Sequence, residues 1–228
     1  MSRLLVGAPL RVEVSRLLAP STVQRASVRV TSGPFSVYGG VRYDPVRREV
    51  RFTPNAPDLR PGLRYVFRVD TTLQAWDGAP LSAALEMPFV PEGRAPAQTP
   101  TTPSLRDDIA PVFAARCARP ECHGGDAPAM GLDLSDADAI YRTAVGVLAA
   151  QSARGGLAPD YTDPRWGALF RVDPGDAPGL GRPAYSYLIY KLLGEGPTRG
   201  GRMPPDAPLT QRELESVSDW IAAGAPRN

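Results

Sequence analysis

Residues 91–103 read Pro91-Glu-Gly-Arg-Ala-Pro-Ala-Gln-Thr-Pro-Thr-Thr-Pro103, and this stretch divides the chain in two. It holds four prolines and no large apolar residue, so it cannot contribute to a packed core. Before it the apolar residues alternate as in strands, and after it they recur at helical spacing. A chain of 228 residues with 43% hydrophobic content can bury two modest cores. We therefore predict two domains, residues 1–91 and 104–228, with a proline-rich linker over residues 92–103.

Six runs in the first half have the period-two or β-branched pattern of strands. They are Leu10–Val14, Ala26–Val30, Phe35–Tyr38, Glu49–Thr53, Leu63–Asp70 and Leu85–Val90. Turn signals such as Gly39-Gly40 and Asp77-Gly-Ala-Pro separate them and supply the backbone conformations of chain reversals. Several short strands at such intervals predict an all-β sandwich.

The first half also resembles the Ig-like domains of bacterial surface and secreted proteins. The matching text is Ser21-Thr-Val, Val41-Arg-Tyr-Asp-Pro, Glu49-Val-Arg-Phe-Thr-Pro, Leu59-Arg-Pro-Gly-Leu-Arg-Tyr-Val-Phe-Arg-Val and Asp77-Gly-Ala-Pro-Leu. The resemblance covers nearly all of residues 1–91. It implies an Ig-like sandwich and an extracytoplasmic setting, and it implies no reaction.

Helix signals dominate the second half, which we predict to be all-α with long irregular loops. Capping patterns open helices at Ser104, Ser135 and Thr210, because a side-chain oxygen there can accept from a free backbone N–H in the first turn. The first helix carries apolar Leu105, Ile109, Val112 and Phe113. The second is predicted to run to about Ala150, the third from Tyr185 to Leu193 with Gly194 after it, and the fourth to Gly224 with Leu214, Val217 and Ile221 buried.

Both cysteines and the only histidine of the chain lie in Cys117-Ala-Arg-Pro-Glu-Cys122-His123. Two thiols followed at once by an imidazole are the arrangement of c-type haem attachment, in which the thiols add to the haem vinyl groups and the histidine binds the iron. The usual motif has two residues between the cysteines, and this one has four. The motif predicts one covalently bound haem c.

A haem at this motif needs a second axial ligand, and no second histidine exists. His123 is the predicted proximal ligand, and a methionine thioether is the natural sixth ligand of an electron-transfer iron. We favour Met203, in Gly-Gly-Arg-Met-Pro-Pro, over Met130, which follows His123 by only seven residues. The alternative for Met203 is that it fills a gap in an apolar core. Candidates for lining the haem or bonding its propionates are Arg165, Trp166, Arg171, Tyr185 and Tyr187.

Residues 104–226 resemble a class I cytochrome c domain, and more specifically the cytochrome c-like modules of bacterial surface proteins. The resemblance is carried by Gly131-Leu-Asp-Leu-Ser, Arg171-Val-Asp-Pro-Gly-Asp, Ser186-Tyr-Leu-Ile-Tyr-Lys-Leu-Leu-Gly, Gly201-Arg-Met-Pro and Trp220-Ile-Ala-Ala-Gly-Ala. Modules of that type often carry the longer cysteine spacing. The resemblance implies electron transfer through a His/Met-ligated haem.

Two other interpretations of the cysteines remain open. Cys117 and Cys122 can form a disulfide, which is plausible in an exported protein but gives His123 no role. They can bind zinc with His123, although a structural zinc site usually has a fourth cysteine or histidine. The rival functions are a haem-free surface or adhesion scaffold with the disulfide, and an electron-transfer subunit of an oxidoreductase.

The charge pattern bears on partners and setting. Residues 1–95 carry 13 basic and 8 acidic side chains and residues 96–228 carry 13 and 16, so the halves are about +5 and −3. Neither half has the clustered basic face of a nucleic-acid binder. No run is long enough to span a membrane, and the N-terminus is too short for a secretory signal. Because covalent haem attachment takes place outside the bacterial cytoplasm, we expect a periplasmic or cell-surface protein from a longer precursor, with a possible lipid anchor and an unknown redox partner protein.

Overall fold

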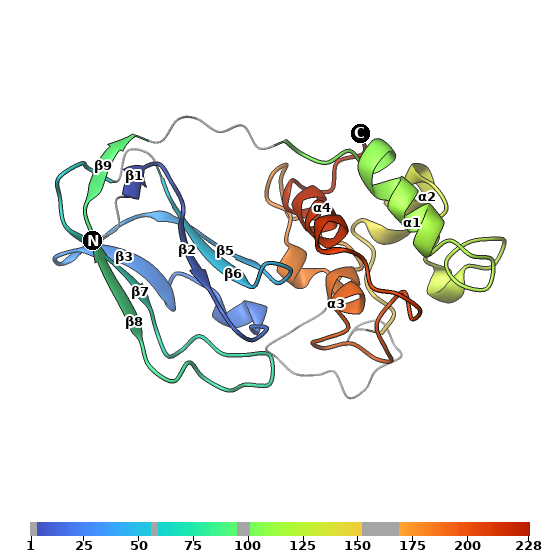
Figure 1. Cartoon of the computed structure of the whole chain (residues 1–228), viewed down its shortest axis with the longest axis horizontal. Helices are drawn as coiled ribbons and strands as arrows, with labels where there is room; N and C mark the ends of the chain where they lie inside the picture. The colour runs from blue at the N-terminus through green and yellow to red at the C-terminus, as the bar shows by residue number, and fades with distance from the viewer. Residues whose placement is uncertain (1–3, 56–58, 95–100, 152–168) are drawn as a thin grey trace. The chain divides into compact units, whose positions relative to one another are not determined.

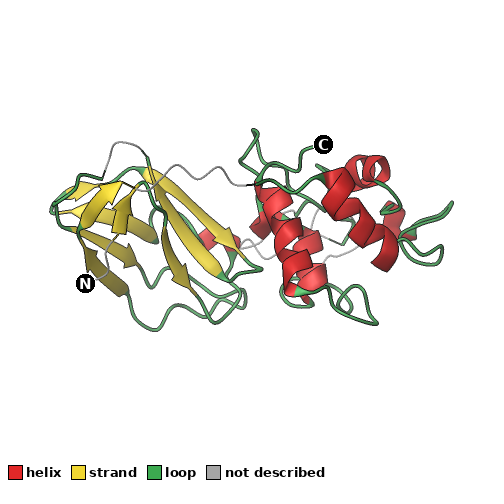
Figure 2. Cartoon of the chain, turned by 45° about the horizontal axis from the view of Figure 1, so that its top comes forward, coloured by secondary structure: helices red, strands yellow, loops and turns green. Residues whose placement is uncertain are grey.

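The computed structural model describes residues 4–55, 59–94, 101–151 and 169–228. The chain forms two compact units, Met1–Pro100 and Thr101–Asn228 (Figure 1). Strands gather in the first unit and helices in the second (Figure 2). No helix among the described residues is both long and apolar enough to cross a membrane.

The first unit contains two antiparallel sheets and a short parallel pair. The three-stranded sheet has the order β2 (Leu10–Glu13), β6 (Glu49–Pro54), β5 (Gly39–Asp44). The four-stranded sheet has the order β4 (Phe35–Ser36), β3 (Val28–Ser32), β7 (Tyr65–Val69), β8 (Leu85–Phe89). The parallel pair joins β1 (Leu4–Val6) to β9 (Pro91–Arg94), and a single 3-10 turn, η1, spans Pro20–Thr22.

Alternating side chains build the core of the first unit. Every second residue of a strand faces the same side of its sheet. The residues on the inner side are fully buried, among them Val28 and Val30 of β3, Phe67 of β7 and Val50 of β6. The rings of Phe52 on β6 and Phe67 on β7 are tilted against each other with centroids 6.5 Å apart. The two sheets therefore share one apolar core.

The predicted Ig-like sandwich is wrong in its strand order. In an Ig domain the second strand pairs in one sheet with the first and fifth, and the third strand lies in the other sheet. Counting from β2, the second strand here is β3, and it pairs with β4 and β7. Only two residues join Ser32 to Phe35, so the connection is a tight hairpin that keeps β3 and β4 as neighbours.

Three strands lie outside the predicted runs: β1, β5 and β9. Gly39-Gly40, interpreted as a turn, begins β5, and Pro91, the last residue of the predicted first domain, begins β9, which continues into residues 92–94 of the predicted linker. A proline is tolerated at the first position of an edge strand because its missing N–H is not needed there. Residues 95–100 of the predicted linker lie outside the described residues.

The second unit combines short helices with irregular segments. The helices are η2 (Leu105–Ile109, a π-helix), α1 (Ala110–Arg116), η3 (Ala129–Gly131), α2 (Ala137–Ala144), η4 (Pro183–Tyr185), α3 (Tyr187–Leu193) and α4 (Gln211–Ala222). Ser104 Oγ accepts from the N–H of Asp107 at 3.2 Å, as its capping pattern predicts. The capping box of Thr210 and Glu213 is also confirmed.

The prediction of an all-α second domain is wrong. Helix α2 ends at Ala144 instead of near Ala150, and the following segment is extended. Val145 forms a parallel bridge with Val172, and Leu148 forms an antiparallel bridge with Phe170. Their β-branched and aromatic side chains favour this pairing over another helical turn. Gly146, with φ +69°, also breaks the helix.

The core of the second unit holds its two ends together. Ile109, Phe113 and Trp220 are fully buried, and Trp220 Nε1 donates to the carbonyl of Pro226 at 3.0 Å. The N–H of Leu105 donates to the side-chain oxygen of Asn228 at 2.9 Å. This frame fixes α1 and α3, the helices that precede the predicted cysteine motif and the loop of Met203.

Candidate functional site

The segment after α1 folds back on itself. The N–H of Cys117 still bonds to Phe113 at 2.8 Å, and the N–H of His123 then donates to the carbonyl of Cys117 at 3.1 Å. A side chain at Gly124 would place its Cβ 2.3 Å from the carbonyl oxygen of Ala118, so the return path needs a glycine. The four residues between the cysteines form a compact turn that brings the backbone of His123 back to that of Cys117.

A cavity of about 310 Å³ opens beside this turn, and both cysteines, His123, Met130 and Met203 line it. Most of the remaining lining is apolar and includes Leu132, Leu134, Leu188 and Leu192. Small-molecule and cofactor sites are mostly apolar clefts of about 300–1,000 Å³ with a few polar groups. The cavity is therefore of the right kind for a ligand, at the smaller end of that range.

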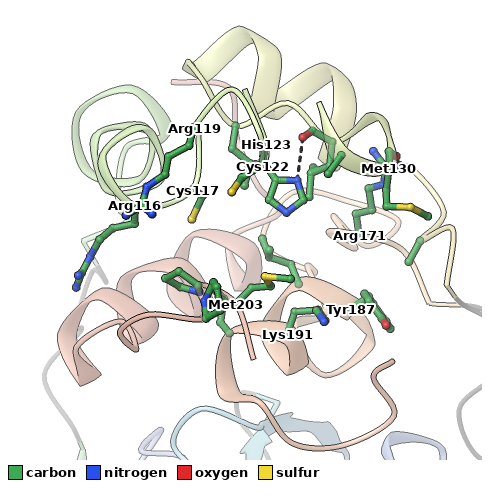
Figure 3. Close-up of a pocket in the computed structure, with 18 of the residues that line it drawn as sticks. Arg116, Cys117, Arg119, Cys122, His123, Met130, Arg171, Tyr187, Lys191 and Met203 are labelled. Carbon is green, nitrogen blue, oxygen red and sulfur yellow. Dashed lines mark hydrogen bonds between the residues drawn. The ribbon is translucent and has the colours of Figure 1, made fainter. Parts of the chain in front are cut away.

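The lining residues come from two walls (Figure 3). Cys117, Cys122 and His123 lie on one side, and Met203 lies across the cavity from them. Met130 lies on the same side as His123. The wall of Met203 also carries Lys191 and Tyr187, which belong to α3.

Hydrogen bonding fixes the tautomer of His123. Its Nδ1 lies 3.2 Å from the carbonyl oxygen of Leu132, and because a carbonyl only accepts, Nδ1 carries the hydrogen. The other ring nitrogen, Nε2, keeps its lone pair and faces the interior of the cavity (Figure 3). Burial lowers the pKa of His123, so the neutral imidazole persists to lower pH than usual. Neutral imidazole is the form that binds metals.

The two cysteines differ in exposure, and both are free thiols. Cys117 is 7% exposed, whereas Cys122 is half-buried. Burial raises the pKa of Cys117 to about 11, so that this thiol is protonated at neutral pH. The structure therefore lacks the disulfide of the alternative interpretation. No group of three His, Cys, Asp or Glu side chains within residues 4–55, 59–94, 101–151 and 169–228 is placed to hold a metal ion.

The two methionines are held by different contacts. The N–H of Met203 donates to the carbonyl of Lys191 at 2.8 Å, and the side chain is 37% exposed. Met130 is 47% exposed and has φ +57°, a left-handed conformation that residues other than glycine rarely adopt. The guanidinium of Arg171 donates to the carbonyls of Met130 and Gly131 and so supports this conformation. Both sulfurs thus reach one cavity, although sequence reasoning gave Met130 little weight.

The structure divides the other predicted lining residues. Arg171 and Tyr187 line the cavity. Tyr185 is absent from the lining and lies under the guanidinium of Arg182, 5.6 Å from the ring centroid. Arg165 and Trp166 lie outside the described residues.

Sequence reasoning missed several polar lining residues. They are Arg116, Arg119, Glu121, Gln151, Lys191 and Asp206. Arg119 belongs to the cysteine turn and forms an ion pair of 2.9 Å with Asp206, which follows Met203, so the pair links the two walls. The sequence does single out Lys191, because it is the only lysine among 26 basic residues. That observation could have pointed to it.

Comparison with known proteins yields no family for this chain. No family model matches it. No curated protein matches it either. The expectation of an Ig-like domain followed by a class I cytochrome c domain is therefore corrected. The strand order differs, the second unit mixes bridges with helices, the cysteine spacing is not that of the usual motif, and the described residues hold no metal-binding group of the kind sought above.

Proposed function

We propose that this chain transfers single electrons through one haem attached covalently to Cys117 and Cys122, with His123 and Met203 as the axial ligands. The observation that carries the proposal is that all four side chains line one cavity. Figure 3 places His123 and Met203 on opposite walls of it. An iron with two axial ligands needs donors on opposite faces of a flat macrocycle.

The donor chemistry of the cavity fits this group. The lone pair of His123 Nε2 faces the interior, and the mostly apolar lining suits a large flat apolar ring. Cys117 and Cys122 would hold the group by adding their S–H bonds across its two vinyl groups, each sulfur bonding to one vinyl carbon and the hydrogen going to the other, with no leaving group. A haem bound there supplies an iron that accepts or gives up one electron.

The protein side chains control the environment of that iron. His123 is held in one tautomer by Leu132, which keeps its ligating nitrogen aimed at the cavity. Met203 supplies a thioether, a soft ligand that favours the reduced iron and raises its potential. If His123 and Met203 filled both axial positions, no position on the iron would be open to oxygen or peroxide. The arrangement therefore favours a relay over catalysis at the iron.

The proposal carries a setting and a partner class. Covalent haem attachment of this kind takes place outside the bacterial cytoplasm, so we place the mature chain in the periplasm or at the cell surface. Its partner is another redox protein, and an electron-transfer subunit of an oxidoreductase fits the same site. The alternative scaffold with a Cys117–Cys122 disulfide has no supporting observation, since both thiols are free.

Matched methionine variants test the ligand assignment. Leucine replaces methionine at nearly constant volume, so Met203→Leu and Met130→Leu remove only the sulfur. In the haem-loaded protein, Met203→Leu is expected to convert low-spin iron to a high-spin form that binds added imidazole, and Met130→Leu is expected to leave the spectrum unchanged. The reverse pattern would assign the ligand to Met130. Wild-type protein without covalent haem would end the proposal itself.

A further inference from the structure

We infer that Lys191 is a positioning residue that fixes the loop of residues 199–203 and thereby holds the Met203 sulfur at the cavity. The inference rests on the proposed function for the role of Met203 as a ligand. The contacts that fix the loop are independent of that role.

Three hydrogen bonds join Lys191 to this loop. Its Nζ donates to the carbonyl of Arg199 at 2.8 Å and to the carbonyl of Gly201 at 2.7 Å. Its own backbone carbonyl accepts from the N–H of Met203 at 2.8 Å. One residue of α3 therefore holds the beginning, the middle and the end of the loop.

The loop has little stiffness of its own. Gly200 and Gly201 are consecutive, and Gly200 has φ +68°. Glycine has more backbone freedom than any other residue, so an ordered conformation here needs outside contacts. A second contact comes from Tyr187, whose hydroxyl accepts from the N–H of Arg199 at 3.0 Å. Tyr187 and Lys191 are four residues apart on α3, so they share one helix face.

Lysine suits this position better than arginine does. Its ammonium is compact, ends a flexible stem and has three donors that can point at separate carbonyls, whereas the donors of arginine are fixed in one rigid plane. The two carbonyls belong to residues 199 and 201 and receive one donor each. Burial lowers the pKa of Lys191, consistent with an ammonium withdrawn from bulk water.

Loss of the Lys191 contacts should affect how Met203 is held opposite His123. Without the two ammonium contacts, the loop keeps the bond from Met203 N–H to residue 191 and the bond from Arg199 N–H to Tyr187, and its middle is released, so the thioether is held less firmly at the cavity. Lys191→Met preserves the length of the aliphatic stem and removes only the donors. Lys191→Arg restores a charged donor. Arg212→Met, on the exposed surface of α4, is the matched control for loss of a basic side chain.

The first experiment measures amide hydrogen exchange in the haem-free variant Cys117→Ser/Cys122→Ser, with and without the change at residue 191. A peptide covering residues 197–205 reports the amides of 199–203, since the label at the start of a peptide is lost and residues 204 and 205 are prolines. Loss of hydrogen bonds from a charged donor is expected to speed exchange there by about tenfold. Lys191→Arg should recover part of the protection, and Arg212→Met should change nothing. Unchanged exchange in Lys191→Met overturns the inference.

The second experiment uses the haem-loaded protein. Lys191→Met is expected to show a mixture of low-spin and high-spin iron and to bind added imidazole about tenfold more tightly than wild type, with partial rescue in Lys191→Arg. A wild-type spectrum in Lys191→Met refutes the positioning role while leaving the proposed function intact. Wild-type protein without covalent haem refutes the proposed function, while the exchange result still decides whether Lys191 fixes the loop.

Discussion

The backbone is held in place by different contacts in the two units of this chain. In the first unit, β5 and β6 pair residue by residue from Gly39 opposite Pro54 to Asp44 opposite Glu49. In the second, the longest described helix has 12 residues, and Arg171 and Lys191 bond to carbonyls of the loops that carry Met130 and Met203. The first unit contains no cysteine and no histidine, and the second contains all of them.

The difference shows where chemistry can be placed. In a continuous strand ladder the backbone N–H and C=O groups bond to one another and the strands pack closely. Loops that are held at only a few points can instead bring side chains from distant parts of the chain to one cavity. Arg171 and Lys191 supply such points on the two sides of the cavity. Contacts in the second unit should therefore be individually more important for the site than any contact in the first.

The largest expected effect separates the two cores. Phe67→Ala is expected to lower the free energy of unfolding of the first unit by about 3–5 kcal/mol, and Trp220→Ala to lower that of the second by a similar amount, because each side chain is fully buried. Hydrogen exchange of the full chain measures both units at once. Protection lost in β7 but retained in α4, and the reverse, is the expected pair of results. Loss in both units from either change would mean that they unfold together.

A chemical effect of nearly that size distinguishes the two thiols. The pKa of Cys117 is raised to about 11 by burial, so its reactive thiolate is scarcer at neutral pH by about a hundredfold than that of an ordinary cysteine. In the haem-free chain, iodoacetamide is expected to label Cys122 first. Labelling of Cys117 should rise about tenfold per pH unit below its pKa. Peptide mass spectrometry measures the labelling rate of each cysteine. Equal rates at Cys117 and Cys122 would contradict the buried placement of Cys117.

Backbone crowding at the cysteine turn gives the next effect. Gly124→Ala forces a Cβ to within 2.3 Å of the carbonyl oxygen of Ala118, and we expect a loss of about 1–3 kcal/mol in the free energy of unfolding of the second unit. Gly201→Ala is the control, because its Cβ would meet no atom within 4 Å. Thermal denaturation compares them. Equal stability of the two variants would show that the turn is not closed as described.

The smallest effect concerns a helix end. Thr210 Oγ1 accepts from the N–H of Glu213 at 3.3 Å, and Thr210→Ala removes this cap at a cost of about 1 kcal/mol. Thr210→Ser keeps the hydroxyl and should retain most of the stability. Urea denaturation of the second unit measures the difference. A loss as large in the serine variant would point to the threonine methyl group instead of the cap.

Local patterns predicted the parts of the fold that local physics decides. The capping patterns at Ser104 and Thr210 located helix starts, whereas α2 is capped by Asp136 instead of the predicted Ser135. The period-two runs located β2, β3, β4, β6, β7 and β8 within a few residues. Gly39 shows where this fails. It resembles a turn residue, yet a Cβ there would lie 2.6 Å from the ring of Phe52, so the glycine serves close packing between β5 and β6. Partners of this kind are distant in sequence, and no local pattern contains them.

The residues of the candidate site also fall into those that the sequence reveals and those that it does not. Cys117, Cys122, His123 and Met203 stand out by residue type, and the structure brings all four to one cavity. Lys191 and Arg171 act on backbone carbonyls of loops, which every residue possesses, so no side-chain pattern reveals the pairing. The family resemblances failed for a related reason, because strand and helix signals do not determine which elements become neighbours.

The intact mass of the full chain tests the central claim most directly. The chain is produced together with the haem-attachment machinery and measured after denaturation, beside the variant Cys117→Ser/Cys122→Ser. The account predicts a wild-type mass equal to the polypeptide plus one haem, and a variant mass equal to the polypeptide alone. A wild-type mass of the bare polypeptide, or of the polypeptide less the hydrogens lost in a disulfide, would contradict it.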